Sequence, residues 1–346
     1  MIKKIFFVAN AESIHTAKWI DYFIDREYDV YVATFTKGNK TKCKNIFYLS
    51  SNGVNKHGGN YHYLFKIDAL SKLFKKIKPD IVNAHYSYSM GLISLLAIKW
   101  AKIDTQFSVV CHGSDILDLP YTFFDKINQY VLRNSDKIFV VSDQIKDKIE
   151  EFNIDMQKVF VGQYGIDINA TQNVKKDIDI LSNRAYNSNS NIDFLLNILE
   201  EYNKKDLKIV FVLPLISDLK LNEFKKRYPN IEFYAEVEYQ KMIELLNRSR
   251  VYISATKSDG TALSLLEAMS LGTIPLVSNI ISNRSWIVDS INGYLFNGKD
   301  DFLKKLDWIL HLDNTKCSEI QTLNSELVDN RANYSKQMKQ IEDFIQ

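Results

Sequence analysis

The sequence predicts an α/β protein made of two successive halves, each built around a parallel β-sheet. Short apolar runs alternate with amphipathic stretches from end to end, which is the pattern of βαβ units. The chain has 346 residues, more than one ordinary hydrophobic core holds and enough for two. The alternation weakens at the polar residues 167–178 and then restarts, which indicates a boundary between the halves.

Five apolar runs predict the strands of the first sheet: KIFFVAN (4–10), DVYVATF (29–35), DIVNAHY (80–86), FSVVCHG (107–113) and KIFVVS (137–142). The amphipathic stretches between them predict helices at 15–25, 64–78, 90–102 and 123–134. In the second of these helices the apolar residues keep helical spacing, and four lysines fall elsewhere: Lys72, Lys75, Lys76 and Lys78. We therefore expect a basic outer face on this helix.

The second half repeats the pattern and predicts strands at 178–184, 207–214, 231–237, 251–256 and 274–279, with helices at 191–205, 221–228, 239–249 and 261–272. The tail NYSKQMKQIEDFIQ predicts one more amphipathic helix. The expected organisation is a first domain at 1–166, a linker at 167–178, a second domain at 179–325, and a C-terminal helix within 326–346 that packs back toward the first domain. Ligands of such a protein are expected in a cleft between the two domains.

Composition and charge exclude several classes of protein. The chain is 46% hydrophobic and 25% charged, as folded proteins are, and its net charge of +2 does not favour nucleic acid as a partner. The start MIKKIFFVANAES has too short an apolar run for a secretion signal, and the longest apolar stretch, GLISLLAIKWA, falls short of the roughly 20 residues of a membrane span. Cys43, Cys111 and Cys317 have no metal-ligand spacing, which fits a reducing compartment. We expect a cytoplasmic protein with, at most, a peripheral contact to the inner face of an anionic membrane.

The stretch SATKSDGTALSLLEAMSLGTIPLVSN (254–279) contains the most informative residues of the chain. A turn with Asp259 and Gly260 follows a predicted strand, and Glu267 then lies among the apolar residues of the next helix. A buried, unpaired carboxylate is costly, so Glu267 is expected to meet a ligand or local backbone. The first N–H groups of the helix lack partners and form an anion site. A sugar nucleotide supplies both a diphosphate for the helix tip and hydroxyls for the acids.

The same stretch resembles the acid-x7-acid signature of the retaining glycosyltransferases of family 4, because seven residues separate Asp259 from Glu267. Further pieces resemble that family in the same order: PDIVNAHY, VVCHGSDI, FVVSDQIK, YGID at 164–167 and INGYLF. The resemblance covers essentially the whole chain. It implies a GT-B fold, with two facing Rossmann-like domains, an acceptor held mainly by the first and a nucleotide-sugar donor held by the second.

The resemblance also implies roles for individual residues. Glu267 would bind the ribose hydroxyls, Asp259 the hydroxyls of the transferred sugar, and Arg184 the diphosphate. His112 would face the donor sugar from the first domain. Phosphate would be held by backbone from Gly260 through Thr261, Ala262, Leu263 and Ser264, with Lys257 as an additional cation. His15, His85 and Tyr86 are candidates for the acceptor side by their position near predicted strand ends or in the first loop, and Asp115 is a further candidate.

The sequence departs from the family pattern at several positions. The outer acid is Asp259 where glutamate is commoner, which leaves the donor sugar open, and Ala262 replaces a second glycine. Asn189 stands where the family usually has a phosphate-binding lysine, so either Arg184 acts alone or another cation such as Lys257 substitutes. The first loop, ANAESIHTAKW, lacks the Gly-Gly of many members.

Structural roles remain open for most of these residues. Asp115 serves equally well as a helix cap. The alternatives are an interior histidine for His112 and a surface residue for Arg184, and a purely structural role also stays open for His15, His85 and Tyr86. The lysines of the 64–78 helix are equally typical of a solvated helix face.

The predicted function is retaining transfer of a sugar, most readily from a UDP-sugar, to a hydroxyl acceptor in the synthesis of a cell-surface polysaccharide, lipopolysaccharide or glycolipid. No cofactor and no essential metal are expected, because no Asp-x-Asp motif occurs at a convincing strand end. A sugar-nucleotide epimerase on the same fold and a two-lobed sugar-binding protein remain alternatives. A nicotinamide dehydrogenase is disfavoured, because VANAES offers no Gly-x-Gly-x-x-Gly turn after the first strand.

Overall fold

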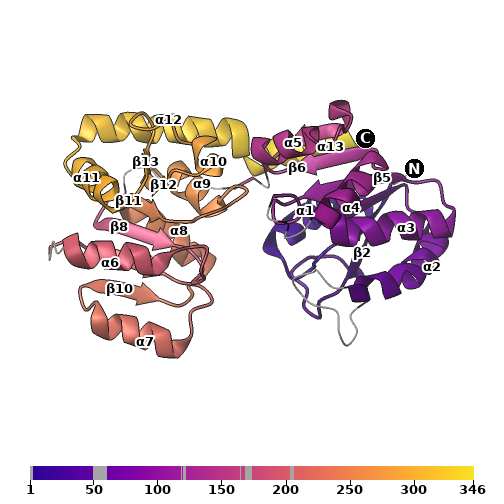
Figure 1. Cartoon of the computed structure of the whole chain (residues 1–346), viewed down its shortest axis with the longest axis horizontal. Coiled ribbons are helices and arrows are strands. Elements are labelled where there is room, and N and C mark those ends of the chain that lie inside the picture. Colours follow the sequence, from indigo (N-terminus) through magenta and orange to yellow (C-terminus); the bar gives the residue numbers. More distant parts are fainter. Residues whose placement is uncertain are drawn as a thin grey trace. The chain divides into compact units, whose positions relative to one another are not determined.

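The computed structural model describes residues 3–49, 61–117, 119, 122–163, 165–167, 174–202 and 206–346. The chain forms two compact units, the first comprising Met1–Tyr164 and Lys336–Gln346, the second Gly165–Ser335. Each unit contains one sheet in which every described strand pair is parallel, with helices between successive strands (Figure 1). The predicted α/β class with two parallel-sheet domains is therefore confirmed. None of the described helices has the length and apolar character needed to cross a membrane.

The sheet of the first unit has the strand order β3-β2-β1-β4-β5-β6-β7. Its strands are β1 (Lys4–Val8), β2 (Asp29–Thr34), β3 (Asn45–Tyr48), β4 (Ile81–His85), β5 (Gln106–Cys111), β6 (Lys137–Val140) and β7 (Val159–Val161). The central strands are buried on both faces, as parallel sheets covered by helices are. Phe6 packs against Phe74 of a helix on one face, and Phe7 packs against Phe23 of a helix on the other.

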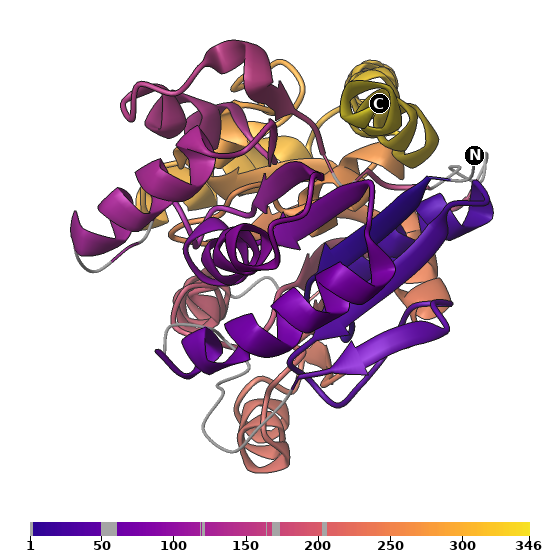
Figure 2. The same ribbon diagram turned by 90° about the vertical axis from the view of Figure 1, so that its right-hand side faces the viewer.

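The helices of the first unit are α1 (Ile14–Asp25), α2 (Ile67–Ile77), α3 (Leu92–Ala101), α4 (Thr122–Arg133), α5 (Asp143–Glu150) and, from the end of the chain, α13 (Tyr334–Ile345). Three short helical segments join them: η1 (Tyr61–Lys66), η2 (Ser87–Gly91) and η3 (Met156–Lys158). Figure 2 shows the parallel strands of this unit with helices packed along them. Glu342 of α13 accepts hydrogen bonds from the Tyr22 hydroxyl over 2.9 Å and from the Tyr28 hydroxyl over 3.1 Å. The last helix is thus part of the first unit.

The sheet of the second unit has the order β10-β9-β8-β11-β12-β13. Its strands are β8 (Ile178–Asn183), β9 (Ile209–Val212), β10 (Ile231–Tyr234), β11 (Ser249–Ser254), β12 (Ile274–Ser278) and β13 (Tyr294–Phe296). Its helices are α6 (Ile192–Tyr202), α7 (Asp218–Arg227), α8 (Tyr239–Arg248), α9 (Leu263–Ser270), α10 (Ile281–Arg284), α11 (Lys299–Leu310) and α12 (Asn314–Ala332). Alternate strand residues enter two separate hydrophobic clusters, with Ile180 in one and Leu181 in the other, so both faces are covered.

All ten predicted strands are present, and three short strands were missed. These three, β3, β7 and β13, each have three or four residues and lie at sheet edges. The tail NYSKQMKQIEDFIQ forms the predicted helix, α13, but the C-terminal segment 326–346 is not a single helix, because α12 ends at Ala332 and α13 begins at Tyr334. Asn333 between them is extended and forms a parallel bridge with Ile166. Half of the predicted linker, 168–173, lies outside the described residues.

Candidate active site

Both sheets reverse their strand order at a point that favours ligand binding. In the first unit β1 lies between β2 and β4, and in the second β8 lies between β9 and β11. In open α/β sheets, ligands bind at the carboxyl ends of the strands beside such a switch point. Most of the predicted site residues follow these strand ends: His85 ends β4, His112 follows β5, Arg184 follows β8 and Asp259 lies in the loop after β11.

Arg184 and Asp259 form the central ion pair of the second unit. Arg184 Nη2 donates to Asp259 Oδ2 over 2.6 Å, and the two side chains are only 17% and 20% exposed. Arg184 Nη1 also donates to Ser264 Oγ over 3.3 Å. These contacts fix the guanidinium at the start of α9, where it adds a full positive charge to the partial charge of the helix terminus.

The N-terminus of α9 is open in the manner expected of an anion site. Ala262 is its N-cap residue and offers no side-chain cap. The first hydrogen bond of the helix runs from the Leu265 N–H to the Ala262 carbonyl over 3.0 Å. The N–H groups of Leu263 and Ser264 come before it and have no carbonyl acceptor within the helix. Thr261 Oγ1 donates to the Gly260 carbonyl over 2.8 Å and shapes the approach to the helix.

Asn189 fastens the loop that carries Asp259. Its Oδ1 accepts from the Ser258 N–H over 3.0 Å, its Nδ2 donates to the Ser258 carbonyl over 2.8 Å, and its own carbonyl accepts from the Lys257 N–H over 3.0 Å. The side chain of Asn189 thus acts as a backbone clamp. Lys257 is exposed beside this clamp. The sequence marked Asn189 only as a departure from the family lysine.

Glu267 lies in the second turn of α9 and is not unpaired. The Tyr239 hydroxyl, from the start of α8, donates to Glu267 Oε1 over 3.3 Å. Burial, and next the charge of Glu267, raises the pKa of Tyr239, so the phenol stays protonated and remains a donor. Tyr239 is half exposed. The contact keeps one oxygen of the carboxylate oriented and leaves it at the rim of the unit.

Tyr252 links the two parts of this site and was missed by the sequence analysis. It is fully buried in β11, and its hydroxyl lies 2.9 Å from Ser264 Oγ. The charges of Arg184, Asp259 and Glu267 all act on the pKa of Tyr252, which burial raises. A tyrosine within an otherwise apolar strand run was the available signal, since a buried phenol requires a hydrogen-bond partner.

The first unit brings three histidines and a tyrosine together. The rings of His85 and His112 lie 5.1 Å apart, and Tyr86 stacks on His112 at 4.2 Å with an interplanar angle of 24°. Burial, followed by the neighbouring His85 and His15, holds the pKa of His112 well below its ordinary value, and burial lowers that of His85 to about 3. These rings are therefore neutral at physiological pH, and His112 acts as a hydrogen-bonding group without charge.

Asp115 organises the backbone beneath these rings. Its Oδ1 accepts from the N–H groups of His112 over 2.8 Å and Gly113 over 3.1 Å, and its Oδ2 accepts from Ser87 over 2.8 Å. Tyr86, immediately before Ser87, has φ of 72°, a strained conformation for a bulky residue. Backbone strain of this kind accumulates at functional sites, where the surrounding structure enforces it.

Two residues expected on the acceptor side are enclosed in the protein. His85 and Asp115 are both 0% exposed, with His85 also packed edge-on against Trp19 at 5.5 Å. Their position corrects the expectation of direct acceptor contact, because a ligand cannot reach side chains covered on all sides. His15 is exposed on α1, and Tyr86 and His112 are partly exposed. These three remain the accessible part of the cluster.

Two Rossmann-like parallel-sheet units, one of them with an open helix tip beside an arginine–carboxylate pair, place the protein in the GT-B structural class. Its residues 4–142 match the glycosyl transferase 4-like family, and its residues 165–322 match the glycosyl transferases group 1. The chain belongs to this family of glycosyltransferases.

Known proteins extend the similarity over most of the chain. An uncharacterized glycosyltransferase of Methanocaldococcus jannaschii, MJ1178, is 21% identical over 90% of this chain and 86% of its own length. The capsular polysaccharide biosynthesis glycosyltransferase CapH of Staphylococcus aureus is 25% identical over 75% of this chain and 76% of its own. The crystal structure of Anabaena HepE in complex with UDP-glucose has a TM-score of 0.77 and 12% identity, and covers 98% of each chain. The structural likeness concerns the fold.

Proposed function

We propose that the protein is a retaining hexosyltransferase that moves a sugar from a UDP-sugar to a hydroxyl group of a glycan or lipid-linked acceptor. The observation that carries this proposal is the Arg184–Asp259 pair at the open tip of α9, with Glu267 two turns into the same helix. A cationic anion site next to two separated carboxylates fits a ligand with a diphosphate flanked by two hydroxyl-bearing rings. The UDP-glucose complex of the structural neighbour supports UDP as the carrier.

The site residues of the second unit each have a distinct part in donor binding. Arg184 and the first N–H groups of α9, at Leu263 and Ser264, hold the diphosphate. Glu267, oriented by Tyr239, accepts hydrogen bonds from the ribose hydroxyls. Asp259 accepts from hydroxyls of the transferred sugar once Arg184 has turned to the phosphates. Lys257 is exposed next to this loop and adds positive charge.

The reaction replaces one bond at the anomeric carbon by another on the same face. The bond between C1 and the diphosphate oxygen breaks, the bond between C1 and the acceptor oxygen forms, and the acceptor proton goes to the departing phosphate. Arg184 and the α9 terminus stabilise the charge that develops on the leaving diphosphate. His112 is neutral and contributes a hydrogen bond to the sugar. Positive charge at the phosphates comes from the protein, so no essential metal is required.

The acceptor side belongs to the exposed members of the histidine cluster, His15, Tyr86 and His112. The printed name of CapH supports a role in cell-surface polysaccharide synthesis. Acceptors of that kind are commonly lipid-linked, so the enzyme would meet them at a membrane. The exposed lysines of α2 would then contact the anionic membrane surface.

A donor screen tests this function. The protein is melted with UDP, GDP and ADP and with their sugars, since a ligand at roughly 100 times its Kd adds about 2.7 kcal/mol to the free energy of unfolding. The stabilising UDP-sugar is then incubated with and without a simple glycoside acceptor, and the product anomer is identified by proton NMR. An α-linked product from an α-linked donor supports the proposal. A sugar altered without any acceptor indicates an epimerase, and an inverted product excludes retention.

A further inference from the structure

A second cavity of the second unit lies at the opposite edge of the sheet from the candidate active site. It has a volume of about 480 Å³ and is lined by Lys176, Arg250, Ile274, Ile309, Asn314, Cys317, Ser318 and Gln321. Lys176 precedes β8, while Arg250 and Ile274 lie at the starts of β11 and β12. Arg184 and Asp259 follow the carboxyl ends of β8 and β11, about 20 Å away along strands of this length. We call this cavity the amino-edge pocket.

The two cations of the amino-edge pocket are only partly engaged by the protein. Lys176 Nζ donates to the Leu271 carbonyl at the end of α9 over 2.9 Å. Arg250 Nη2 donates to the Leu310 carbonyl at the end of α11 over 3.0 Å, and its Nη1 lies 3.5 Å from Asp179 Oδ1. An ammonium has three N–H donors and a guanidinium five. Both side chains therefore retain donors for a ligand.

No acidic residue is among those that line the amino-edge pocket in the described part of the chain. Two acids lie close by. Asp179 pairs with Arg250, and its second oxygen accepts from the Lys208 N–H over 2.9 Å. Asp313, which precedes Asn314, caps α12 through the Lys316 N–H over 2.8 Å. The positive end of the 19-residue helix α12 opens at the pocket through Asn314 and Ser318.

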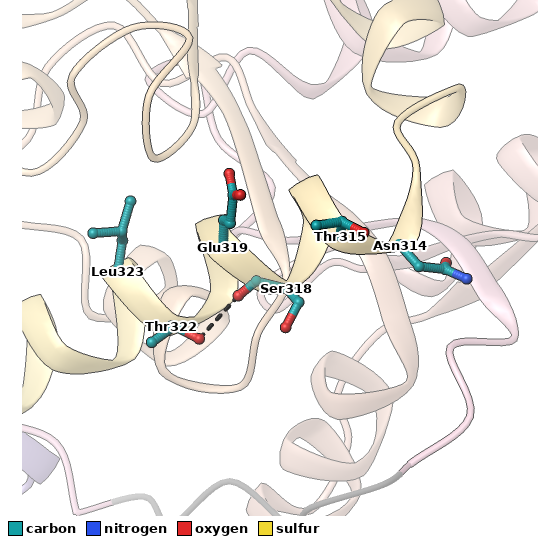
Figure 3. Close-up of a pocket in the computed structure, with 6 residues that line it drawn as sticks. All are labelled: Asn314, Thr315, Ser318, Glu319, Thr322 and Leu323. Atoms are coloured by element: carbon teal, nitrogen blue, oxygen red, sulfur yellow. Dashed lines mark hydrogen bonds between the residues drawn. The ribbon is translucent and has the colours of Figure 1, made fainter.

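Asn314 and Ser318 also line an adjoining hollow along α12, which Figure 3 draws. In that view the Ser318 hydroxyl and the Glu319 carboxylate project from different sides of the helix. Glu319 is engaged by Lys316, 2.9 Å away. The amino-edge pocket thus combines two cations, a helix terminus and neutral polar side chains.

We propose that the amino-edge pocket binds a phosphate-bearing small molecule, with Lys176 and Arg250 on the phosphate and Asn314, Ser318 and Gln321 as hydrogen-bond partners. The volume is within the range of small-molecule sites and exceeds what a single ion needs. Burial lowers the pKa of Lys176 to about 8, because no carboxylate compensates its charge, and a bound anion supplies that compensation. This site is independent of the proposed transferase activity.

Inorganic phosphate and glycerol phosphate are the probes for this site, titrated calorimetrically into the full chain at constant ionic strength. We expect saturable binding, weakened about tenfold or more by Ser318→Asp, which places a negative charge in the pocket at a helix position that tolerates acids. The matched control is Thr322→Asp, one turn further along α12 and outside the pocket lining, with a change of about twofold or less. Circular dichroism melting in phosphate-free buffer verifies the fold of each variant.

Two further variants separate this site from the candidate active site. Lys176→Gln is expected to weaken phosphate binding as Ser318→Asp does, and Arg184→Gln is expected to leave intact the phosphate binding that these two variants remove. Binding that survives Ser318→Asp and Lys176→Gln but is lost in Arg184→Gln assigns the phosphate to the tip of α9 and overturns the proposal. The absence of saturable binding of both probes to the wild-type chain also overturns it.

Discussion

Arg184 Nη2 and Asp259 Oδ2 lie 2.6 Å apart, so the cation proposed for the diphosphate and the acid proposed for the sugar are hydrogen-bonded to each other in the second unit. Both side chains are largely covered, which strengthens the pair relative to a surface ion pair. In the proposed function, donor binding draws Arg184 from Asp259 to the phosphates, and the released carboxylate then accepts from the sugar hydroxyls. The ion pair holds the guanidinium and the carboxylate in position beside α9.

Asp259→Ala should impair transfer by about 10²-fold or more while leaving the affinity for bare UDP unchanged or slightly higher. The reason is that, in the proposed function, the sugar is the only part of the donor that Asp259 contacts, and its removal frees Arg184 for the phosphates. Transfer rates and calorimetric UDP affinities are compared with those of Asp307→Ala, which removes an exposed acid on α11. An equal loss of affinity for UDP and for the UDP-sugar would contradict the role given to Asp259.

Glu267→Ala should abolish transfer and leave the fold intact, because a carboxylate at the rim contributes little to stability and much to donor binding. Tyr239→Phe removes the hydroxyl that contacts Glu267 Oε1 and should raise KM for the donor several-fold with a smaller change in kcat. Glu244→Ala on α8 is the control for loss of a carboxylate. A folded Glu267→Ala protein with normal turnover would remove the central assignment.

The sequence predicted the buried strands of both sheets and most of the helices between them, because their period is clear, but it missed four of the described helices: α5, α10, α11 and the 19-residue α12. The buried strands of both sheets are apolar runs, and the helices between them have apolar faces, so hydrophobic burial alone specifies them. The edge strand β3 is only half buried, and β7 has no fully buried residue, so neither carries that signal. The break at Asn333 depends on its bridge with Ile166, far away in the chain, which no local pattern encodes.

Sequence spacing could indicate which residues to examine in the candidate site. It could not predict contacts between residues that only the folded chain brings together. The interval between Asp259 and Glu267 directed attention to the α9 region, where Asp259 pairs with Arg184 and Glu267 accepts from Tyr239. The double hydrogen bond of Asn189 to Ser258 required the folded loop to be seen. His85 was a candidate for the acceptor side because it lies near a strand end, yet it is buried, with Trp19 and His112 packed against it.

His85→Phe should make the stability of the first unit depend less steeply on pH in the acid range. Burial lowers the pKa of His85 to about 3, while the unfolded chain binds its proton near the ordinary value of 6.5. Below pH 6.5 the unfolded state binds more protons than the folded state. Lowering the pH therefore reduces the free energy of unfolding, by up to about 1.4 kcal/mol per pH unit for this residue. Neither ring nitrogen of His85 has a hydrogen-bond partner among the described residues, so phenylalanine loses no such bond.

Hydrogen exchange of peptides from β4 and β5 measures this effect within the first unit, between about pH 7 and pH 5. His311→Phe is the matched control, because that histidine is exposed on the second unit. A profile of the His85→Phe protein as steep as that of the wild type would show that His85 is protonated in the folded state and is not held neutral by burial.

The exposed lysines of α2 should attach the first unit to anionic membranes. Leu70, Phe74 and Ile77 of this helix face the core, which leaves four lysines in solvent: Lys72, Lys75, Lys76 and Lys78. Lys72 pairs with Asp68 over 2.7 Å, but both side chains are more than half exposed, so the pair competes weakly with a lipid surface. Near such a surface each lysine contributes about 1 kcal/mol, and changing all four to glutamine should lower vesicle affinity by about tenfold or more.

Sedimentation with vesicles of anionic and of neutral lipid tests this surface at low and at high salt. The wild-type chain should bind only the anionic vesicles, and added salt should release it, because screening shortens the reach of the lysine charges. The control variant changes four lysines of the second unit to glutamine: Lys220, Lys225, Lys226 and Lys241. This control variant has the same net charge as the α2 variant. An equal loss of binding in both would show that net charge alone decides vesicle binding, and that α2 is not a specific membrane-binding surface. Wild-type protein that fails to sediment with anionic vesicles at low salt would exclude the membrane contact and leave the transferase proposal untouched.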